Sequence, residues 1–415
     1  MENSERIVIT GIGTLSSLGV GKEQFLDNII QNIPGISLRN KWKYEGIKTQ
    51  YFGVCSSFSI KEHLKNLRFP FPLRYSQLAM LGCHLAIKDA QLDLPSLSPE
   101  RLGLILNTDI AANTAVEKYL LKLYEKGADK VSPLNFTKTV ANCALGDVTR
   151  YFKLRGPSSM LLGENSMCYG FDLLQDNKAD IMICGGFDEL RDCTFYNYVV
   201  NDKILPSTES GKDPLPLKEI MQKTDGSGKL ILGEASAFVV LEKLEHALSR
   251  NAPIYAEVLG YSIGCDGVAN HMIAERSYTD LTSVILSSIH EAGISEDEVD
   301  LVIGGSCLPW QVKDYETKAI ESTCLKPEVY YTTIKSKTGE TFGASATLSL
   351  ATGALSMKYQ LVPGTSFPNQ AVKGVKHHIR IPENCERPSE SVNYSLVNSI
   401  HVGGNTTSTI LKRYL

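Results

Sequence analysis

A polar corner between an apolar strand and a helix is the position in this chain best suited to a nucleophile. Residues 159–162 are apolar and predict a strand buried on both faces, and residues 163–166, Gly-Glu-Asn-Ser, end it before a helix-compatible segment. The N-terminus of a helix stabilises an anion and points free N–H groups toward it. The residues do not match the position, because an asparagine amide is not nucleophilic at neutral pH. The corner therefore has the geometry of a nucleophile position but lacks a nucleophile at Asn165.

The segments around the corner predict strands alternating with helices. Apolar runs predict buried strands, and small or amphipathic residues at helical spacing predict the helices between them. This order favours mostly parallel sheets covered by helices on both faces. The polar stretch 205–229 is expected to be an exposed loop. A lone Gly-x-Gly at residues 11–13 lacks the third glycine of a dinucleotide site, so nucleotide binding is not expected there.

A helix followed by a strand occurs twice in the chain, with a similar linker between the two elements. Residues 86–108 read as a helix, an acidic linker and an apolar strand, and residues 288–305 repeat that order. Internal similarity of this kind predicts a duplicated architecture. We therefore divide the chain into two similar halves, residues 1–250 and residues 251–415.

Composition excludes several classes of function. The chain has 415 residues and a formal net charge of −4, without basic runs, so nucleic acid is not an expected partner. No apolar run is long enough to cross a membrane, and the N-terminal residues do not resemble a signal peptide. Its ten cysteines contain no Cys-x-x-Cys pair, so neither a metal site nor a disulfide framework is predicted. A reducing cytoplasm is the expected location.

The chain resembles the β-ketoacyl synthases of the thiolase superfamily over almost its whole length. The matching segments are RIVITGIGTLSSLG, KVSPLNFTKTVANCALGD with RGPS, GEASAFVVLEKLEHALSRNAPIYAEVLGYS, TTIKSKTGETFGASA and NSIHVGGNTTSTILKR. The resemblance implies an α/β thiolase fold, with a duplicated αβαβα five-layered architecture and mixed, mostly parallel sheets. It also implies an obligate dimer. Acyl chains would arrive on the phosphopantetheine of an acyl carrier protein, and the chain itself would bind no cofactor.

The condensation reaction of the β-ketoacyl synthases needs a cysteine thiolate and two histidines. The thiolate accepts the acyl chain, and the histidines promote malonyl decarboxylation and stabilise the enolate. Alignment without gaps puts Asn165 at the nucleophile position, and one inserted residue would put Ser166 there. Cys168 lies three residues beyond Asn165, so it is kept as a displaced nucleophile.

The two histidine positions also differ from the family pattern. Gly305 stands at the first, and it has no side chain that could donate a proton. Glu340 stands at the second, where a carboxylate would repel a developing enolate. The family lysine is retained as Lys335, and we expect it to form an ion pair with Glu340. Val402 replaces the phenylalanine of the family's gating loop.

All three catalytic groups are replaced, although the segments around them match the family. This combination predicts a chain length factor of a type II polyketide synthase. Such a subunit pairs with an active ketosynthase and shapes the tunnel in which the polyketide grows. In the family an amide replaces the cysteine, and Glu164 with Asn165 resembles the acidic-amide dipeptide found there. The expected tunnel residues, for which ordinary interface packing is the alternative, are Phe136, Thr137, Val140 and Ala141.

Three alternatives stay open. The first is a ketosynthase-like decarboxylase of malonyl-acyl carrier protein that uses Ser166, although Gly305 and Glu340 supply nothing to stabilise the enolate. The second is an active condensing enzyme that uses Cys168 with an unusual base. The third is an interaction protein without a tunnel.

Overall fold

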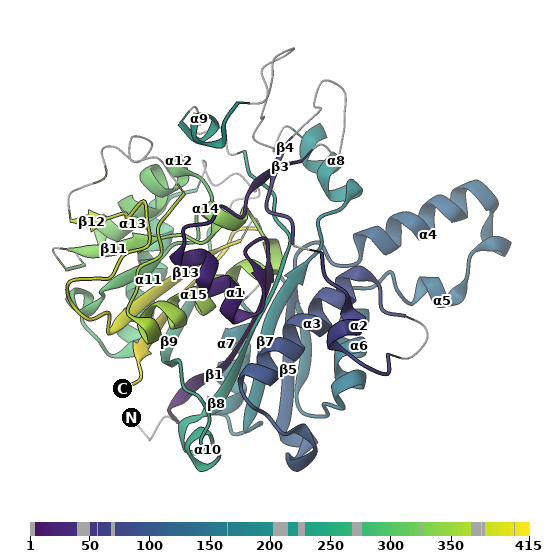
Figure 1. The fold of residues 1–415 in the computed structure, drawn as a ribbon, viewed down its shortest axis with the longest axis horizontal. Helices are drawn as coiled ribbons and strands as arrows, with labels where there is room; N and C mark the ends of the chain where they lie inside the picture. Colours follow the sequence, from purple (N-terminus) through teal and green to yellow (C-terminus); the bar gives the residue numbers. More distant parts are fainter. Residues whose placement is uncertain are drawn as a thin grey trace.

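The computed structural model describes residues 5–39, 50–55, 57–67, 71–163, 165–201, 215–222, 229–267, 276–323, 325–326, 328–366, 375, 378–401 and 403–415. Two mixed sheets form its centre, and helices pack on and between them (Figure 1). The N- and C-terminal ends of the chain lie near each other on one side of the molecule.

The first sheet is built by the first half of the chain. Its strands run in the order β1, β8, β7, β5, β6, in which β7, β5 and β6 are parallel and β8 is antiparallel to both neighbours. A short strand, β2, also pairs with β1. The strands are β1 (Ile7–Ser16), β2 (Gly19–Val20), β5 (Leu102–Thr108), β6 (Ser158–Leu162), β7 (Ile181–Asp188) and β8 (Ala235–Lys243).

The second sheet repeats this pattern. Its order is β9, β14, β13, β10, β11, β12, in which β13, β10, β11 and β12 are parallel and β14 is antiparallel to both neighbours. The strands are β9 (Ala256–Cys265), β10 (Leu301–Ile303), β11 (Val329–Thr332), β12 (Ile379–Arg380), β13 (Tyr394–Ile400) and β14 (Asn405–Arg413). Antiparallel pairing of β1 with β9 joins the sheets, and β3 (Ser37–Arg39) pairs with β4 (Gln50–Phe52) separately. The proposed boundary at residue 250 lies between β8 and β9.

The helices form three layers around the two sheets. Helix α3 packs on the outer face of the first sheet, α11 packs on the outer face of the second, and α7 and α15 lie between the sheets (Figure 1). Residues 345–357 of α15 are all buried, as a central helix requires. This is the five-layered αβαβα arrangement that the resemblance predicts.

The α-helices have the following bounds: α1 (Lys22–Ile30), α2 (Ile60–His63), α3 (Arg74–Asp89), α4 (Asn113–Lys126), α5 (Pro133–Phe136), α6 (Cys143–Phe152), α7 (Ser166–Gln175), α8 (Asp192–Val200), α9 (Leu217–Gln222), α10 (Leu244–Ser249), α11 (Tyr278–Ala292), α12 (Pro309–Gln311), α13 (Thr317–Ser322), α14 (Lys335–Thr338) and α15 (Ser345–Tyr359). A π-helical turn, Val312–Glu316, connects α12 to α13. No helix in the described ranges is long and apolar enough to span a membrane.

The glycines of β1 serve helix packing. A Cβ atom at Gly13 would lie 2.3 Å from the carbonyl oxygen of Gly82 in α3, closer than any real Cβ contact. Helix α3 therefore lies directly on the backbone of β1. The Gly-x-Gly pattern thus has a structural explanation in close helix-to-strand approach.

Two expectations from the sequence are wrong. Strand β6 was expected to be buried on both faces, but it is the outer strand of its sheet, and the side chain of Leu162 is 62% exposed. An apolar run has the same pattern in a central strand and in an edge strand. The stretch 205–229 was expected to be a loop, but α9 lies within it, because Ile220 and Met221 pack into the core of the second half. Residues 202–214 and 223–228 lie outside the described residues.

Candidate active-site region

Asn165 caps helix α7. Its side-chain Oδ1 accepts a hydrogen bond from the backbone N–H of Met167 at 3.1 Å, and the residue is buried. A side chain that caps a helix in this way satisfies one of the free N–H groups of the first turn. The amide is therefore engaged by the backbone N–H that could otherwise bind an anion. Glu164, the other half of the expected dipeptide, lies outside the described residues.

Ser166 and Cys168 follow on the first turn of α7. Both residues are buried, and Cys168 belongs to the core between the two sheets. The Ser166 hydroxyl oxygen has no hydrogen-bond partner within the described part of the chain. Buried hydroxyl groups are normally paired, so an unpartnered one at the N-terminus of a helix is unusual.

Gly305 lies where β10 ends, and there is no room for a side chain at this position. A Cβ atom built on it would lie 2.9 Å from both the backbone nitrogen and the Cγ1 atom of Ile400, at the end of β13. An imidazole could therefore not be added here without moving the end of β13. The chain after β10 and the end of β13 approach each other so closely at Gly305 that only a glycine fits there.

Glu316 fixes the loop that contains Gly305. Its carboxylate accepts hydrogen bonds from the backbone N–H groups of Gly305 (2.9 Å) and Ser306 (3.1 Å), the Tyr331 hydroxyl (2.7 Å) and the Asn398 amide (3.0 Å). Burial, together with the nearby Glu316 carboxylate, raises the pKa of Tyr331 well above its usual value. Tyr331 therefore stays protonated and keeps donating to Glu316.

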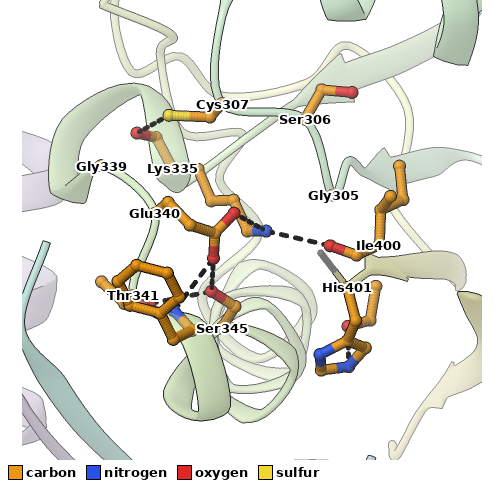
Figure 2. A network of polar contacts seen from close by, with 12 residues as sticks. Gly305, Ser306, Cys307, Lys335, Gly339, Glu340, Thr341, Ser345, Ile400 and His401 are labelled. Atoms are coloured by element: carbon orange, nitrogen blue, oxygen red, sulfur yellow. Dashed lines mark hydrogen bonds and ion pairs between the residues drawn. The ribbon is translucent and has the colours of Figure 1, made fainter. Parts of the chain in front are cut away.

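Lys335 and Glu340 form the ion pair that their spacing predicted. The Lys335 ammonium lies 2.8 Å from Oε2 of Glu340 and 3.4 Å from the carbonyl oxygen of Ile400 (Figure 2). Oε1 of Glu340 accepts from the backbone N–H of Phe342 at 2.9 Å and from the Ser345 hydroxyl at 2.7 Å. Both charged residues are almost fully buried. Every charge in this group is thus matched inside the protein.

Cys307 lies beside this pair, and its Sγ is 3.9 Å from the carbonyl oxygen of Lys335. Burial, and secondarily the Glu340 carboxylate, raises the pKa of the Cys307 thiol to about 12. The thiolate is the nucleophilic form of cysteine, so Cys307 is inert at neutral pH.

His401 occupies the gating loop and was missed as a contact residue by sequence reasoning. Its Nδ1 lies 3.9 Å from a carboxylate oxygen of Asp109, beyond the end of β5, and its Nε2 lies 3.2 Å from the Ser399 hydroxyl. Arg276 donates to the His401 carbonyl oxygen at 2.5 Å and is paired with buried Asp266 at 2.9 Å. The histidine was visible in the sequence, but nothing there placed it beside Asp109. Val402, the next residue, lies outside the described residues.

Asp188 joins the two halves at the same place. Its buried carboxylate accepts hydrogen bonds from the Thr108 hydroxyl (2.5 Å) and from the backbone N–H groups of Asp109 and Gly343 (both 2.8 Å). Burial, and next the charge of Asp109, raises the pKa of Asp188 to about 7, against the opposing effect of these hydrogen bonds. Burial also raises the pKa of Tyr198, and the carboxylates of Glu340, Asp109 and Asp188 add to this effect. The Tyr198 hydroxyl thus lies within range of the charges of all three carboxylates.

The corner before α7 is connected to this group through the gating loop. The Asn405 side chain donates to the carbonyl oxygen of Gly163 at 3.0 Å, and the carbonyl oxygen of Asn405 accepts from the His401 backbone N–H at 2.9 Å. The structure thus brings Gly305, Lys335 and Glu340 together around Ile400, and links them to the corner through residues 401–405.

The expected tunnel residues begin at the end of α5, which with α4 extends from the body of the molecule (Figure 1). Phe136 is the last residue of α5, and Thr137, Val140 and Ala141 lie between α5 and α6. The side chain of Phe136 is 56% exposed and contacts the ring of Tyr119, with ring centroids 5.6 Å apart. Thr137 and Val140 are exposed, and Ala141 is half-buried.

Comparison with known proteins identifies the family. The model of the β-ketoacyl synthase N-terminal domain matches residues 4–247, and the model of the C-terminal domain matches residues 255–367. The chain is 26% identical to "3-oxoacyl-[acyl-carrier-protein] synthase 2" of Staphylococcus aureus (strain COL) over the full length of both proteins. It is also 26% identical to the protein of that name in Coxiella burnetii, over 98% of each chain.

Solved structures share the fold at lower identity. "The ishigamide ketosynthase/chain length factor" covers all of both chains at 21% identity with a TM-score of 0.83. A type II polyketide synthase ketosynthase in complex with its acyl carrier protein covers 99% of this chain and 100% of its own at 19% identity, with a TM-score of 0.81. These matches confirm the thiolase-like fold. Since the N-terminal domain model alone covers more than half of the sequence, the chain belongs to the β-ketoacyl synthase family.

Proposed function

We propose that this chain is a catalytically degenerate ketosynthase-like subunit, a chain length factor. It would pair with an active ketosynthase and shape the tunnel that receives polyketide chains carried on an acyl carrier protein. The proposal rests on the replacement of all three catalytic groups, at Asn165, Gly305 and Glu340, in a chain whose surrounding segments match the family.

The geometry around these positions supports the loss of condensation chemistry. The Asn165 amide caps α7, and no side chain fits at Gly305 without moving the end of β13. The Glu340 carboxylate is held by Lys335, so the retained lysine is engaged by a protein group. A carbon–carbon bond-forming step would need a thiolate and two donors to the developing oxyanion, and these positions offer neither.

The exposed apolar surface supports a large partner. Strand β6 is paired on one side only, and Leu162 on this edge is 62% exposed. Leu120, Leu121 and Tyr124 on α4, and Phe136 on α5, are more than half exposed as well. An open edge strand with apolar side chains favours pairing with a second chain. Among the structures of the same fold, one is named as a ketosynthase with a chain length factor and another as a ketosynthase bound to its carrier protein.

The proposed tunnel positions come from the resemblance to the family. Phe136 ends α5, and Thr137, Val140 and Ala141 lie between α5 and α6, where a partner could cover them. Larger side chains at Val140 or Ala141 would then shorten the space available to the growing chain. The related curated proteins carry the name of a synthase, and this chain differs in that we propose no synthase activity for it alone.

Co-expression with a ketosynthase that retains the cysteine and both histidines tests the proposal. The expected results are a stable heterodimer and a polyketide product that is shorter for Val140→Phe and Ala141→Trp. Leu248→Phe, at an exposed residue of α10, is the matched control and should leave product length unchanged. Condensation by this chain purified alone would contradict the proposal, and an unchanged product from both variants would remove these positions from the tunnel.

The unpartnered Ser166 hydroxyl favours a second candidate, a malonyl-acyl carrier protein decarboxylase. In this case the isolated chain would convert malonyl-carrier protein to acetyl-carrier protein, and Ser166→Ala would abolish the reaction. The two histidine positions weigh against it, because Gly305 has no side chain and Glu340 is paired with Lys335, so neither offers a donor to the enolate. Absence of acetyl-carrier protein after prolonged incubation would exclude this candidate, and mass spectrometry of the same sample would detect any acyl group on Cys168.

A further inference from the structure

The Glu340 carboxylate is bound by three donors from the segment 335–345. Figure 2 shows the ammonium of Lys335 in α14 and the hydroxyl of Ser345 at the start of α15 beside this carboxylate. The third donor is the backbone N–H of Phe342. All four residues are at most 3% exposed. One cation, one hydroxyl and one backbone N–H converging on one carboxylate are a typical set of ligands for a bound monoanion.

The backbone holds these donors independently of the Glu340 side chain. The main chain of Glu340 is fixed on both sides, because its N–H donates to Ile231 at 2.7 Å and its carbonyl accepts from Gly233 at 2.7 Å. Phe342 has a positive φ of 52°, a conformation that costs energy in a non-glycine residue, and its backbone N–H donates to the carboxylate at 2.9 Å. The donor set would therefore persist if the side chain of residue 340 were shortened.

From this geometry we propose that the chain contains an anion-binding pocket that its own Glu340 side chain fills. Glu340 acts as an internal plug: it satisfies Lys335, Phe342 and Ser345, and it excludes external carboxylates from them. The ligand class that the emptied pocket would take is a small monocarboxylate such as formate or acetate. This inference does not depend on a ketosynthase partner or on a tunnel.

The filled site also excludes external carboxylates. A carboxylate that enters from outside would find that Lys335, Phe342 and Ser345 already donate to Glu340.

Truncation of Glu340 followed by addition of formate tests the proposal. Glu340→Ala leaves a buried ammonium without its partner, so we expect a Tm lower than wild type by about 5 °C or more. Sodium formate should restore Tm in a saturable manner, because a ligand that binds only the folded state stabilises it. Sodium chloride at equal ionic strength and the neutral isostere formamide should not.

Three control proteins make the result specific. Wild type should show no saturable response to formate, because its pocket is filled. Glu340→Gln should show none either, because the amide fills the same volume. The double variant Glu340→Ala/Lys335→Met should lose the response because it lacks the cation. If Glu340→Ala does not fold by itself, the Tm cannot be measured. The yield of folded protein after refolding with and without formate is then measured instead.

Two outcomes would overturn the proposal. One is an equal effect of formate on wild type, Glu340→Ala and the double variant, which would indicate a general salt effect. The other is failure of formate to raise Tm or to recover folded Glu340→Ala. Neither outcome bears on the chain length factor proposal, which is decided by heterodimer formation and product length.

Discussion

The contribution of Lys335 and of Glu340 to the stability of the fold depends on the burial of both side chains. Removing two charges from water is costly, and their attraction offsets this cost only while both partners are present. The Ser345 hydroxyl and the Phe342 N–H satisfy the other carboxylate oxygen. The pair is thus a structural element whose two members depend on each other.

Lys335→Met is expected to destabilise the protein by about 3–5 kcal/mol, because it leaves the Glu340 carboxylate buried without its cation. Urea unfolding followed by circular dichroism measures this loss. The matched control is Lys318→Met, which removes an exposed ion pair with Asp314 at 3.6 Å and should cost about 0–1 kcal/mol. Equal effects of the two substitutions would show that burial is not what makes the first pair important.

Gly305→Ala tests the closed contact between β10 and β13. The added methyl group would lie 2.9 Å from the Ile400 backbone nitrogen, so we expect destabilisation of about 1–3 kcal/mol from overpacking. Gly146→Ala in α6 is the control, because no atom lies within 4 Å of its Cβ position and alanine favours a helix. The measurement is the free energy of unfolding, and a stabilised Gly305→Ala would contradict the contact.

At the scale of the elements, edge strand β6 and the arm of α4 and α5 carry exposed apolar side chains. Leu162 on the edge and Tyr124 on the arm are 62% and 91% exposed, respectively. Such side chains contribute little to the stability of the single chain, since they are not buried in it. Their effect is expected in assembly.

Leu162→Lys is therefore expected to leave the unfolding free energy of this chain within about 0.5 kcal/mol of wild type. With a ketosynthase partner the same substitution should weaken the heterodimer, because a lysine on an edge strand opposes strand pairing. Size-exclusion chromatography with light scattering over a dilution series checks this, with Leu248→Lys on α10 as control. A heterodimer that dissociates at the same concentration as wild type would place the interface elsewhere.

At the scale of the whole molecule, a buried carboxylate joins several elements of the first half. Glu242 in β8 accepts from Thr10 in β1 and from Arg250 and His246 after the strand, and Arg250 also donates to Ala90 at the end of α3. Burial alone would raise the pKa of Glu242, but these donors outweigh it and the net pKa is lowered. Glu242 thus connects the first sheet to the helix that precedes the second.

A lowered pKa in the folded state gives a definite pH dependence. The charged form of Glu242 is favoured by folding, so its contribution is fully present above the usual glutamate pKa and is lost as pH falls through the lowered value. We expect Glu242→Gln to be less stable than wild type at pH 7, and the difference to shrink as the solution is acidified below about pH 4.5. Urea unfolding at several pH values measures it, and a constant difference would refute the assignment.

The sequence predicted the fold and part of the candidate site. The alternation of strands and helices predicted mostly parallel sheets covered by helices, and the resemblance to the family predicted the five layers. The Lys335–Glu340 pair could be predicted because its members lie only five residues apart in the chain. Contacts such as His401 with Asp109, or Asp188 with Gly343, join segments far apart in the chain, and only the folded structure places them. The apolar residues of β6 were misread as central, because hydrophobicity does not report how many neighbours a strand has.

The contact between Gly305 and Ile400 has a consequence for the history of the protein. An ancestor with histidine at this position would have needed space that the end of β13 now occupies. A single codon change back to histidine would meet that obstacle, so the return requires compensating mutations elsewhere first. Restoring a histidine at residue 305 would therefore require a change at the end of β13 as well.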